Sequence, residues 1–224
     1  MKKTPYLPYL AVIAALLLVI AHLVIWLHAP VELTMGLVQK IFYLHLPMAW
    51  WALLSFFLVF VGSVGVLLRK TDFWDALAGS AAELGVLFSG LALITGSLWA
   101  RPIWNVWWTW DPRLTTALIM WFVYTGYLVL RTSPLPHIKR RTLCAVLGIV
   151  AFVDIPLVFF STRLWRSIHP SVISSSGGGM EPEMWHAMGA SLAAMGVLWL
   201  VLLIVRTRQI TATQRLDSLW SARL

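Results

Sequence analysis

The sequence predicts an all-α integral membrane protein with six transmembrane helices and both termini in the cytoplasm. Of its 224 residues, 60% are hydrophobic and 12% are charged, whereas about a quarter of a soluble domain is charged. The mean hydropathy of +0.81 agrees with this class. The apolar residues gather in six runs, and a helix needs roughly 20 such residues to cross a bilayer. We therefore expect residues 1–224 to form a single six-span membrane domain.

The runs predict helices at about 6–27, 47–68, 76–99, 114–130, 142–161 and 185–205. No signal-peptide cleavage pattern interrupts the first run, so we expect it to stay as a membrane anchor. The third run contains Glu83 and the fifth contains Asp154. A charge at the bilayer centre costs roughly 2.5–3.5 kcal/mol. Each carboxylate is therefore a functional candidate, unless it is protonated or hydrogen-bonded to a neighbouring helix.

The last three runs carry local signals of their own. The fourth begins after Asp111 and Pro112, which start a helix well because the carboxylate caps the first turn and proline suits the first helical position. The fifth holds Cys144, the one cysteine of the chain, which excludes an internal disulfide and a C-x-x-C motif. In the sixth, Gly189 and Ala193 lie four residues apart and would permit a close helix contact.

Basic residues divide unequally between the two sides of the membrane. With a cytoplasmic N-terminus, twelve fall in the inner segments: Lys2, Lys3, Arg69, Lys70, Arg131, Lys139, Arg140, Arg141, Arg206, Arg208, Arg215 and Arg223. Five fall in the outer segments: Lys40, Arg101, Arg113, Arg163 and Arg166. This asymmetry satisfies the positive-inside rule. The net charge of +8 therefore reflects topology and predicts no nucleic-acid partner.

Three outer loops, at 28–46, 99–113 and 162–184, emerge on the same face. Ten of the fourteen tryptophans lie in or beside these loops. Residues 31–44 mix apolar and polar positions too closely to span, and predict a short helix on the membrane surface. The run SSSGGG at 174–179 predicts either a mobile lid or partner-docking loop, or a plain connector. We expect function on this outer face.

The densest stretch reads WARPIWNVWWTWDPRLT, from residue 99 to residue 115. Its aromatic and charged side chains are Trp99, Trp104, Trp107, Trp108, Trp110, Asp111, Arg101 and Arg113. A membrane-interface belt explains single indoles at span ends, but it explains five in one loop poorly. In a locally helical segment Trp104 and Trp108 would share a face, as would Trp107 and Asp111. The stretch predicts a broad apolar ligand platform with polar edges.

Four histidines, His28, His45, His169 and His186, also fall on the outer face. Neutral imidazole is a common axial ligand of haem iron. Indoles stack on a porphyrin, and arginines pair with carboxylates such as the haem propionates. Bound haem would therefore unite these features, although the spacing leaves open which two histidines bind it.

The stretch Trp99–Thr115 resembles the tryptophan-rich WWD signature of haem-handling proteins. Six spans in 224 residues is similar to the smallest of these families, cytochrome c maturation protein C (CcmC). The segments YLHLP at 43–47 and FFSTRLWRSIHP at 159–170 occupy the positions of the two outer histidines of the family. The chain departs from the family pattern at Ala100, where we expect glycine, and at Pro112. Neither departure removes a group that could contact haem.

The resemblance implies that His45 and His169 are the axial ligands of haem b, bound as a transported ligand on the periplasmic face of a bacterial inner membrane. It also implies transfer of this haem to the membrane-anchored chaperone CcmE, for cytochrome c maturation. The ATP-driven CcmA and CcmB subunits and the small CcmD are the other partners implied, beside membrane lipid. The chain has no G-x-x-x-x-G-K-[ST] motif, so any ATP chemistry belongs to a partner. It has no hydrolytic or redox motif either.

Two other functions are alternatives. The permease subunit of an ABC transporter also has about six spans, but such a subunit needs no tryptophan platform. A membrane cytochrome b holds haem between histidines inside the bilayer, and here only His22 lies well within a span.

Overall fold

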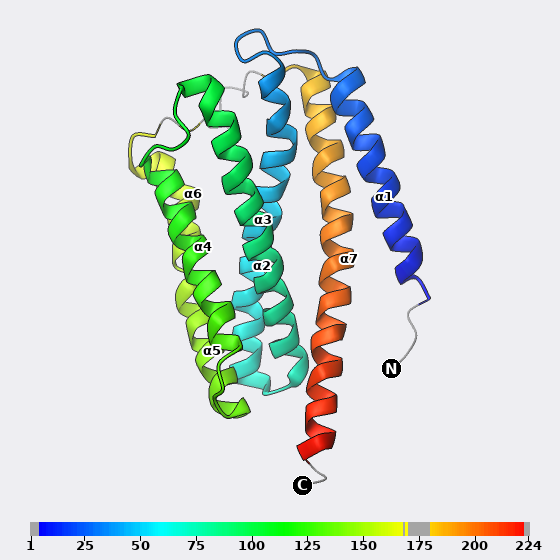
Figure 1. Ribbon diagram of the computed structural model, residues 1–224, viewed down its shortest axis with the longest axis vertical. Helices are drawn as coiled ribbons and strands as arrows, with labels where there is room; N and C mark the ends of the chain where they lie inside the picture. Colours follow the sequence, from blue (N-terminus) through cyan, green and yellow to red (C-terminus); the bar gives the residue numbers. More distant parts are fainter. Residues whose placement is uncertain (1–4, 168, 170–179, 222–224) are drawn as a thin grey trace.

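The computed structural model describes residues 5–167, 169 and 180–221, which fold as one helical bundle (Figure 1). Its helices are α1 (Leu7–Leu23), α2 (Phe42–Arg69), α3 (Asp72–Trp104), α4 (Pro112–Arg131), α5 (His137–Ala151), α6 (Asp154–Leu164) and α7 (Pro182–Ser221). Within the described residues six helical segments are long and apolar enough to cross a membrane, α5 and most of α6 forming one of them. The prediction of an all-α protein with six spans is confirmed.

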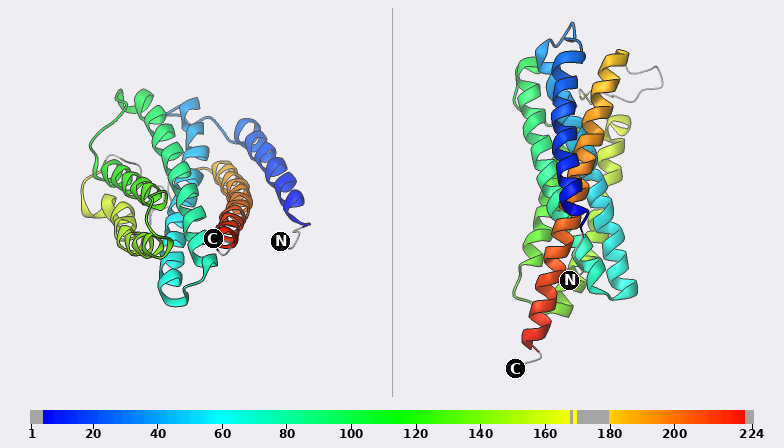
Figure 2. Two further views of the ribbon diagram at one scale, coloured as in Figure 1. Left: turned by 60° about the horizontal axis from the view of Figure 1, so that its bottom comes forward. Right: turned by 90° about the vertical axis from the view of Figure 1, so that its right-hand side faces the viewer.

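Two long neighbouring helices, α2 and α3, form the centre of the bundle. On one side α7 packs against both of them and α1 packs against α7, while α4, α5 and α6 cover the other side (Figures 1 and 2). Phe56 of α2 stacks on Tyr124 of α4 with ring centres 3.8 Å apart. Gly85 of α3 makes room for this pair, because a Cβ there would lie 2.4 Å from the Phe56 ring.

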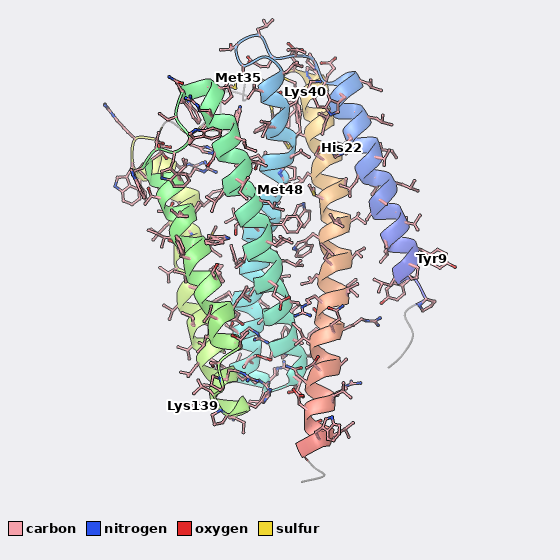
Figure 3. The ribbon with its side chains drawn as sticks, in the orientation of Figure 1. Tyr9, His22, Met35, Lys40, Met48 and Lys139 are labelled. Carbon is pink, nitrogen blue, oxygen red and sulfur yellow. The ribbon has the colours of Figure 1, made fainter. Side chains whose placement is uncertain are left out.

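All the tryptophan-bearing loops lie at one end of the bundle. The short turns after α2 and α4 lie at the other end, where α7 also ends (Figure 1). The labelled side chains give the same division, because Met35 and Lys40 lie at the first end and Lys139 at the second (Figure 3). The described parts of the three predicted outer loops therefore lie at one end of the bundle.

Several helix ends differ from those predicted. Helix α2 begins at Phe42 and α3 runs to Trp104, where Asn105 ends it in the left-handed conformation with φ 59°. Helix α7 continues to Ser221, well beyond the predicted end at 205. Apolar composition marks the part of a helix that lies in lipid, whereas the helix itself continues into the polar flanks. The start of α4 follows the prediction, since Asp111 accepts a hydrogen bond of 2.9 Å from the Arg113 backbone.

The predicted surface helix over 31–44 is wrong. Residues 31–36 form a turn in which the Glu32 carboxylate accepts hydrogen bonds from the Thr34 and Met35 backbone N–H groups. Gly36 leaves this turn with φ 62°, and a short 3₁₀ segment, η2 (Leu37–Ile41), leads directly into α2. A side chain that bonds nearby backbone donors competes with helix formation, which explains why the helix starts later.

The two intramembrane carboxylates have different surroundings. Glu83 of α3 forms an ion pair with Arg206 of α7, whose Nη2 donates to Oε1 at 2.9 Å while Nε contacts Oε2. Glu83 thus bonds to a neighbouring helix, which is the alternative that the sequence offered to a functional role. One carboxylate oxygen of Asp154 is buried and has no hydrogen-bond partner among the described residues. The predicted contact at Gly189 is not seen within the described chain, where a Cβ would meet nothing within 4 Å.

Candidate functional site

Two histidines that are far apart in the sequence meet at the tryptophan-bearing end of the bundle. His45 lies in the first turn of α2, and His169 lies in the loop that follows α6. Their ring centres are 6.4 Å apart, with 37° between the ring planes. Trp99, near the end of α3, lies 6.3 Å from the His45 ring. Three elements therefore converge on one place.

The His45 ring is held by the neighbouring helix α3. Its Nδ1 lies 3.0 Å from the Ala92 carbonyl oxygen and 3.1 Å from the Thr95 hydroxyl. Because a carbonyl can only accept, Nδ1 carries the proton and donates it, which leaves the lone pair on Nε2. Gly96 permits the close approach, since a Cβ there would lie 3.1 Å from Cε1 of His45. This is the arrangement in which the other ring nitrogen of a metal-binding histidine is fixed by the protein.

A short chain of hydrogen bonds connects His169 to the start of α4. The His169 backbone N–H donates to the Ser167 hydroxyl at 3.1 Å. That hydroxyl donates in turn to Oδ1 of Asp111 at 2.8 Å. The same oxygen accepts the Arg113 backbone N–H that caps α4. Asp111, 8% exposed, therefore has the predicted cap role and also anchors the loop that carries His169.

The five tryptophans of the loop fall into a buried and an exposed set. Trp99 is 5% exposed and packs near Trp104 with ring centres 6.2 Å apart. Trp107 and Trp110 are 58% and 77% exposed. Trp108 is partly buried and meets the Trp110 ring edge-on, at 6.1 Å and 82°. The described residues offer no hydrogen-bond partner to the buried indole N–H of Trp99 or of Trp108.

The expected pairing of these side chains on helix faces is wrong. The helix ends at Trp104, and residues 105–111 are not helical. Asn105 in the left-handed region and Pro112 at the start of α4 confine the intervening segment to an irregular path. The platform is therefore built by a loop, and its exposed indoles do not share a helical face with their neighbours four residues away.

The two arginines at the edge of the loop differ in their surroundings. Arg101 donates at 2.6 Å to the Asn105 carbonyl and also contacts the Asn105 side chain. Its guanidinium lies 5.9 Å from the Trp107 ring centre. Arg113 is partly buried beside the cap that its own backbone makes with Asp111.

The other two outer histidines form a separate pair. Nε2 of His28 lies 3.3 Å from Nδ1 of His186, and the rings are nearly parallel. This pair joins the end of the π-helical turn η1 (Val24–His28) to the first turns of α7. The four histidines that spacing alone could not sort thus divide into two pairs.

Sequence reasoning missed three residues that position the histidines. Thr95, Gly96 and Ser167 belong to no metal-binding pattern, and only Ser167, two residues before His169, lies close in sequence to the histidine that it contacts. The predicted lid or connector at 174–179 lies outside the described residues.

Comparisons with known proteins identify the family of the chain. The family model for CcmC, described as heme exporter protein C, matches residues 2–222. Heme exporter protein C of Bradyrhizobium diazoefficiens is 31% identical over 95% of this chain and 81% of its own length. A putative cytochrome c biosynthesis ccmC-like mitochondrial protein of Marchantia polymorpha is 32% identical over 84% of this chain and 80% of its own length. Heme exporter protein C of Escherichia coli K12 is 26% identical over 91% and 86%, respectively. The chain, a multi-pass membrane protein, therefore belongs to the CcmC, or heme exporter protein C, family.

Proposed function

We propose that this protein delivers haem for cytochrome c maturation and binds it at the outer end of the bundle between His45 and His169. The distance between the two imidazole ring centres is the main observation that supports this proposal. An iron bound from both sides needs two metal–nitrogen bonds of about 2 Å each, plus roughly 1 Å from each nitrogen to its ring centre. The 6.4 Å between the ring centres is close to this requirement.

Haem suits this site better than a bare metal ion does, because the two histidines have no further metal-binding side chains grouped with them among the described residues. The described residues contain no group of three or more histidines, cysteines or carboxylates that could hold a bare metal ion. A haem iron brings four nitrogens of its own and needs only two more ligands. A pair of histidines is therefore sufficient for haem and insufficient for a closed zinc site.

The tryptophan loop would hold the porphyrin itself. Its exposed indoles, Trp107 and Trp110, present large apolar faces, while Trp99 and Trp104 close the wall beside His45. The buried indole N–H groups of Trp99 and Trp108, which have no hydrogen-bond partner among the described residues, suit an acceptor such as a propionate. Arg101 and Arg113 would pair with the same carboxylates.

The manner of binding supports a carrier. The one cysteine, Cys144, is buried in α5, so haem would be held as haem b without a covalent bond to the chain. Ligands held in this way can be released to a partner, and the exposed indoles make the site accessible. We propose that CcmE receives the haem on the periplasmic face of a bacterial inner membrane, and that CcmA, CcmB and CcmD are the other partners.

The experiment is a haem titration of the purified protein followed by visible absorption. We expect His45→Ala and His169→Ala each to retain some haem, because stacking supplies much of the affinity, but with a shifted Soret band and poor delivery to CcmE. The matched control is His186→Ala, which removes an outer histidine of the other pair and should leave the spectrum unchanged. A native spectrum in both His45 and His169 variants would transfer the ligand role to His28 and His186.

A further inference from the structure

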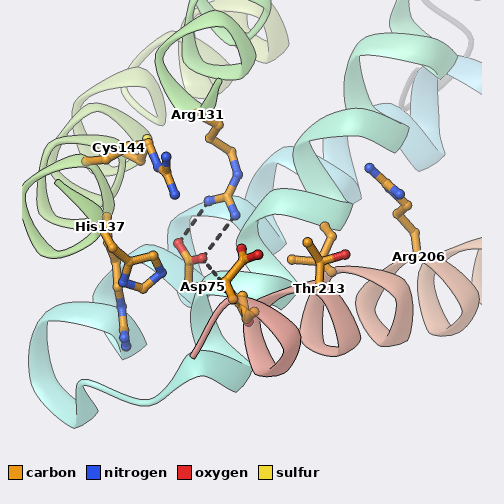
Figure 4. A pocket seen from close by; sticks show the side chains of 11 residues that line it. Asp75, Arg131, His137, Cys144, Arg206 and Thr213 are labelled. Carbon is orange, nitrogen blue, oxygen red and sulfur yellow. Dashed lines mark hydrogen bonds and ion pairs between the residues drawn. The ribbon is translucent and has the colours of Figure 1, made fainter. Parts of the chain in front are cut away.

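We propose that the end of the bundle opposite these histidines contains a binding site for a phosphate group, carried by a membrane lipid such as phosphatidylglycerol. A cavity of about 200 Å³ lies there between α5 and α7. Helix α5 packs mainly on α2 and α4, whereas α7 packs on α1, α2 and α3, which leaves space between the two (Figure 4). Four arginines and two aspartates are among the side chains that line it.

The burial of two of these arginines distinguishes the cavity from an ordinary basic loop. Arginines at the cytoplasmic ends of spans commonly reach into water, where their attraction for anions is screened. Here the side chains of Arg131 and Arg141 are only 17% and 13% exposed. Charges that are shielded from water interact more strongly. Three of the arginines are already paired with carboxylates of the described residues: Arg131 with Asp75, Arg141 with Asp72 and Arg206 with Glu83. Arg140 forms none of these ion pairs, so it is the arginine of the lining that most favours an incoming anion.

The arginines are also fixed before any ligand arrives. Arg131 donates from both terminal nitrogens to the Asp75 carboxylate, at 2.9 and 3.0 Å, and Gln214 donates to the same carboxylate at 2.7 Å (Figure 4). Glu83 holds Arg206 in a similar way. A guanidinium has five N–H donors, so a bidentate carboxylate leaves others for a ligand. Because Asp75 is occupied by these donors, it opposes an incoming anion less than an unpaired carboxylate would.

The remaining lining groups indicate what else the ligand carries. Arg140 donates to the Ser133 carbonyl at 3.3 Å, and Thr213 places a hydroxyl at the cavity. The amide oxygen of Gln214 is buried and accepts no hydrogen bond from the described residues. A ligand that offers both a phosphate and a hydroxyl donor matches this set.

The position of the cavity relative to the membrane indicates a lipid as the source of that phosphate. One span ends at Arg131 and the next begins at His137, which places the arginines at the level of the lipid headgroups. Basic pockets between helices on the cytoplasmic side of membranes bind the headgroups of anionic lipids. Phosphatidylglycerol supplies the phosphate and the hydroxyls together.

The test measures how much lipid the full-length protein in detergent retains when it is offered phosphatidylglycerol or phosphatidylcholine. We expect preferential retention of phosphatidylglycerol and a loss of about tenfold in Arg140→Gln, the magnitude of one charge-assisted hydrogen bond. Arg140 is chosen because Arg131 is part of a buried ion pair that supports the fold. The matched control is Lys139→Gln, which removes the neighbouring exposed charge outside the lining and should change retention by less than about twofold.

Each other outcome has a definite meaning. Equal losses of about fivefold in both variants would indicate general attraction to the anionic surface and would overturn the site. No preference for phosphatidylglycerol in the unaltered protein, without displacement of the lipid by inorganic phosphate, would also overturn it. Displacement of bound phospholipid by millimolar inorganic phosphate, with both lipids retained equally, would keep the phosphate site and overturn its assignment to a lipid. Thermal unfolding of both variants establishes that neither loss comes from misfolding.

Discussion

At the scale of single residues, Gly96 decides how closely α3 approaches His45. Alanine is favoured over glycine inside a helix by about 1 kcal/mol, so Gly96→Ala should not destabilise α3. The added Cβ would nevertheless lie 3.1 Å from the His45 ring and displace it by a few tenths of an ångström. We expect weaker haem binding and an altered Soret band with an unchanged or raised melting temperature. A haem titration and a thermal melt of the same sample measure both. An unchanged spectrum would show that the His45 position is not critical.

Ser167 has the corresponding role for His169. Its hydroxyl connects the His169 backbone to Asp111, and a hydrogen bond of this kind contributes about 0.5–1.5 kcal/mol. Ser167→Ala should therefore lower haem affinity by roughly 2- to 10-fold and increase the high-spin fraction in the electron paramagnetic resonance spectrum. Threonine keeps the hydroxyl, so Ser167→Thr should restore the low-spin signal. Failure of this rescue would contradict the positioning role.

These contacts mark the limit of what the sequence predicts about the site. The tryptophan platform and the outer position of four histidines follow from composition and topology. The assignment of His45 and His169 as one pair comes from the family resemblance, and their proximity agrees with it. Thr95 and Gly96 could not be predicted, because they contact His45 across 50 and 51 positions of the chain and carry no chemical pattern of their own.

At the scale of the elements, the loop between α3 and α4 separates two kinds of tryptophan. Replacing Trp107 and Trp110 together by alanine should reduce the haem bound per protein without lowering the melting temperature, because both indoles are largely exposed. Trp99→Ala is the contrasting variant. It removes a side chain that is 5% exposed, and should destabilise the fold by about 3–5 kcal/mol. Haem content and thermal unfolding are measured for both. A simple aromatic belt would give the double variant full haem content and lower membrane yield.

Helix ends show why the elements were predicted better than their boundaries. Six apolar runs were sufficient to find six spans. Hydropathy could not predict that α7 continues to Ser221, because this polar part of the helix lies beyond the apolar run. The end of α3 depends on one left-handed residue, Asn105, and the Glu32 turn takes the place of the helix that was predicted from residue 31. Such local hydrogen bonds and backbone angles, rather than the average composition of a segment, determine where a helix begins and ends.

At the scale of the whole molecule, the two ends of the bundle should lie in different compartments. The prediction is tested with cysteines introduced at two exposed positions. Leu33 lies in the turn before η2, in a loop at the tryptophan end, and Ile138 lies in the first turn of α5, which starts at the other end (Figure 1). We expect a membrane-impermeant thiol reagent added outside intact cells to label Leu33→Cys and not Ile138→Cys, because the basic residues mark the second end as cytoplasmic. Cys144 is buried, so the parent chain should give little background. The reverse labelling pattern would place the histidines in the cytoplasm and exclude periplasmic delivery.

The distance along the chain between the two facing histidines has a consequence for biosynthesis. Positions 45 and 169 are 124 residues apart, and the loop with Asp111 lies between them. At roughly 5–20 residues per second, a ribosome needs on the order of 6 to 25 seconds to proceed from the first histidine to the second. During that interval the nascent chain holds His45, and later also the indoles of the loop, without the second histidine. Haem can be coordinated by both proposed ligands only after the fifth span and His169 have been made. A stalled or truncated polypeptide that ends earlier would therefore lack the second ligand.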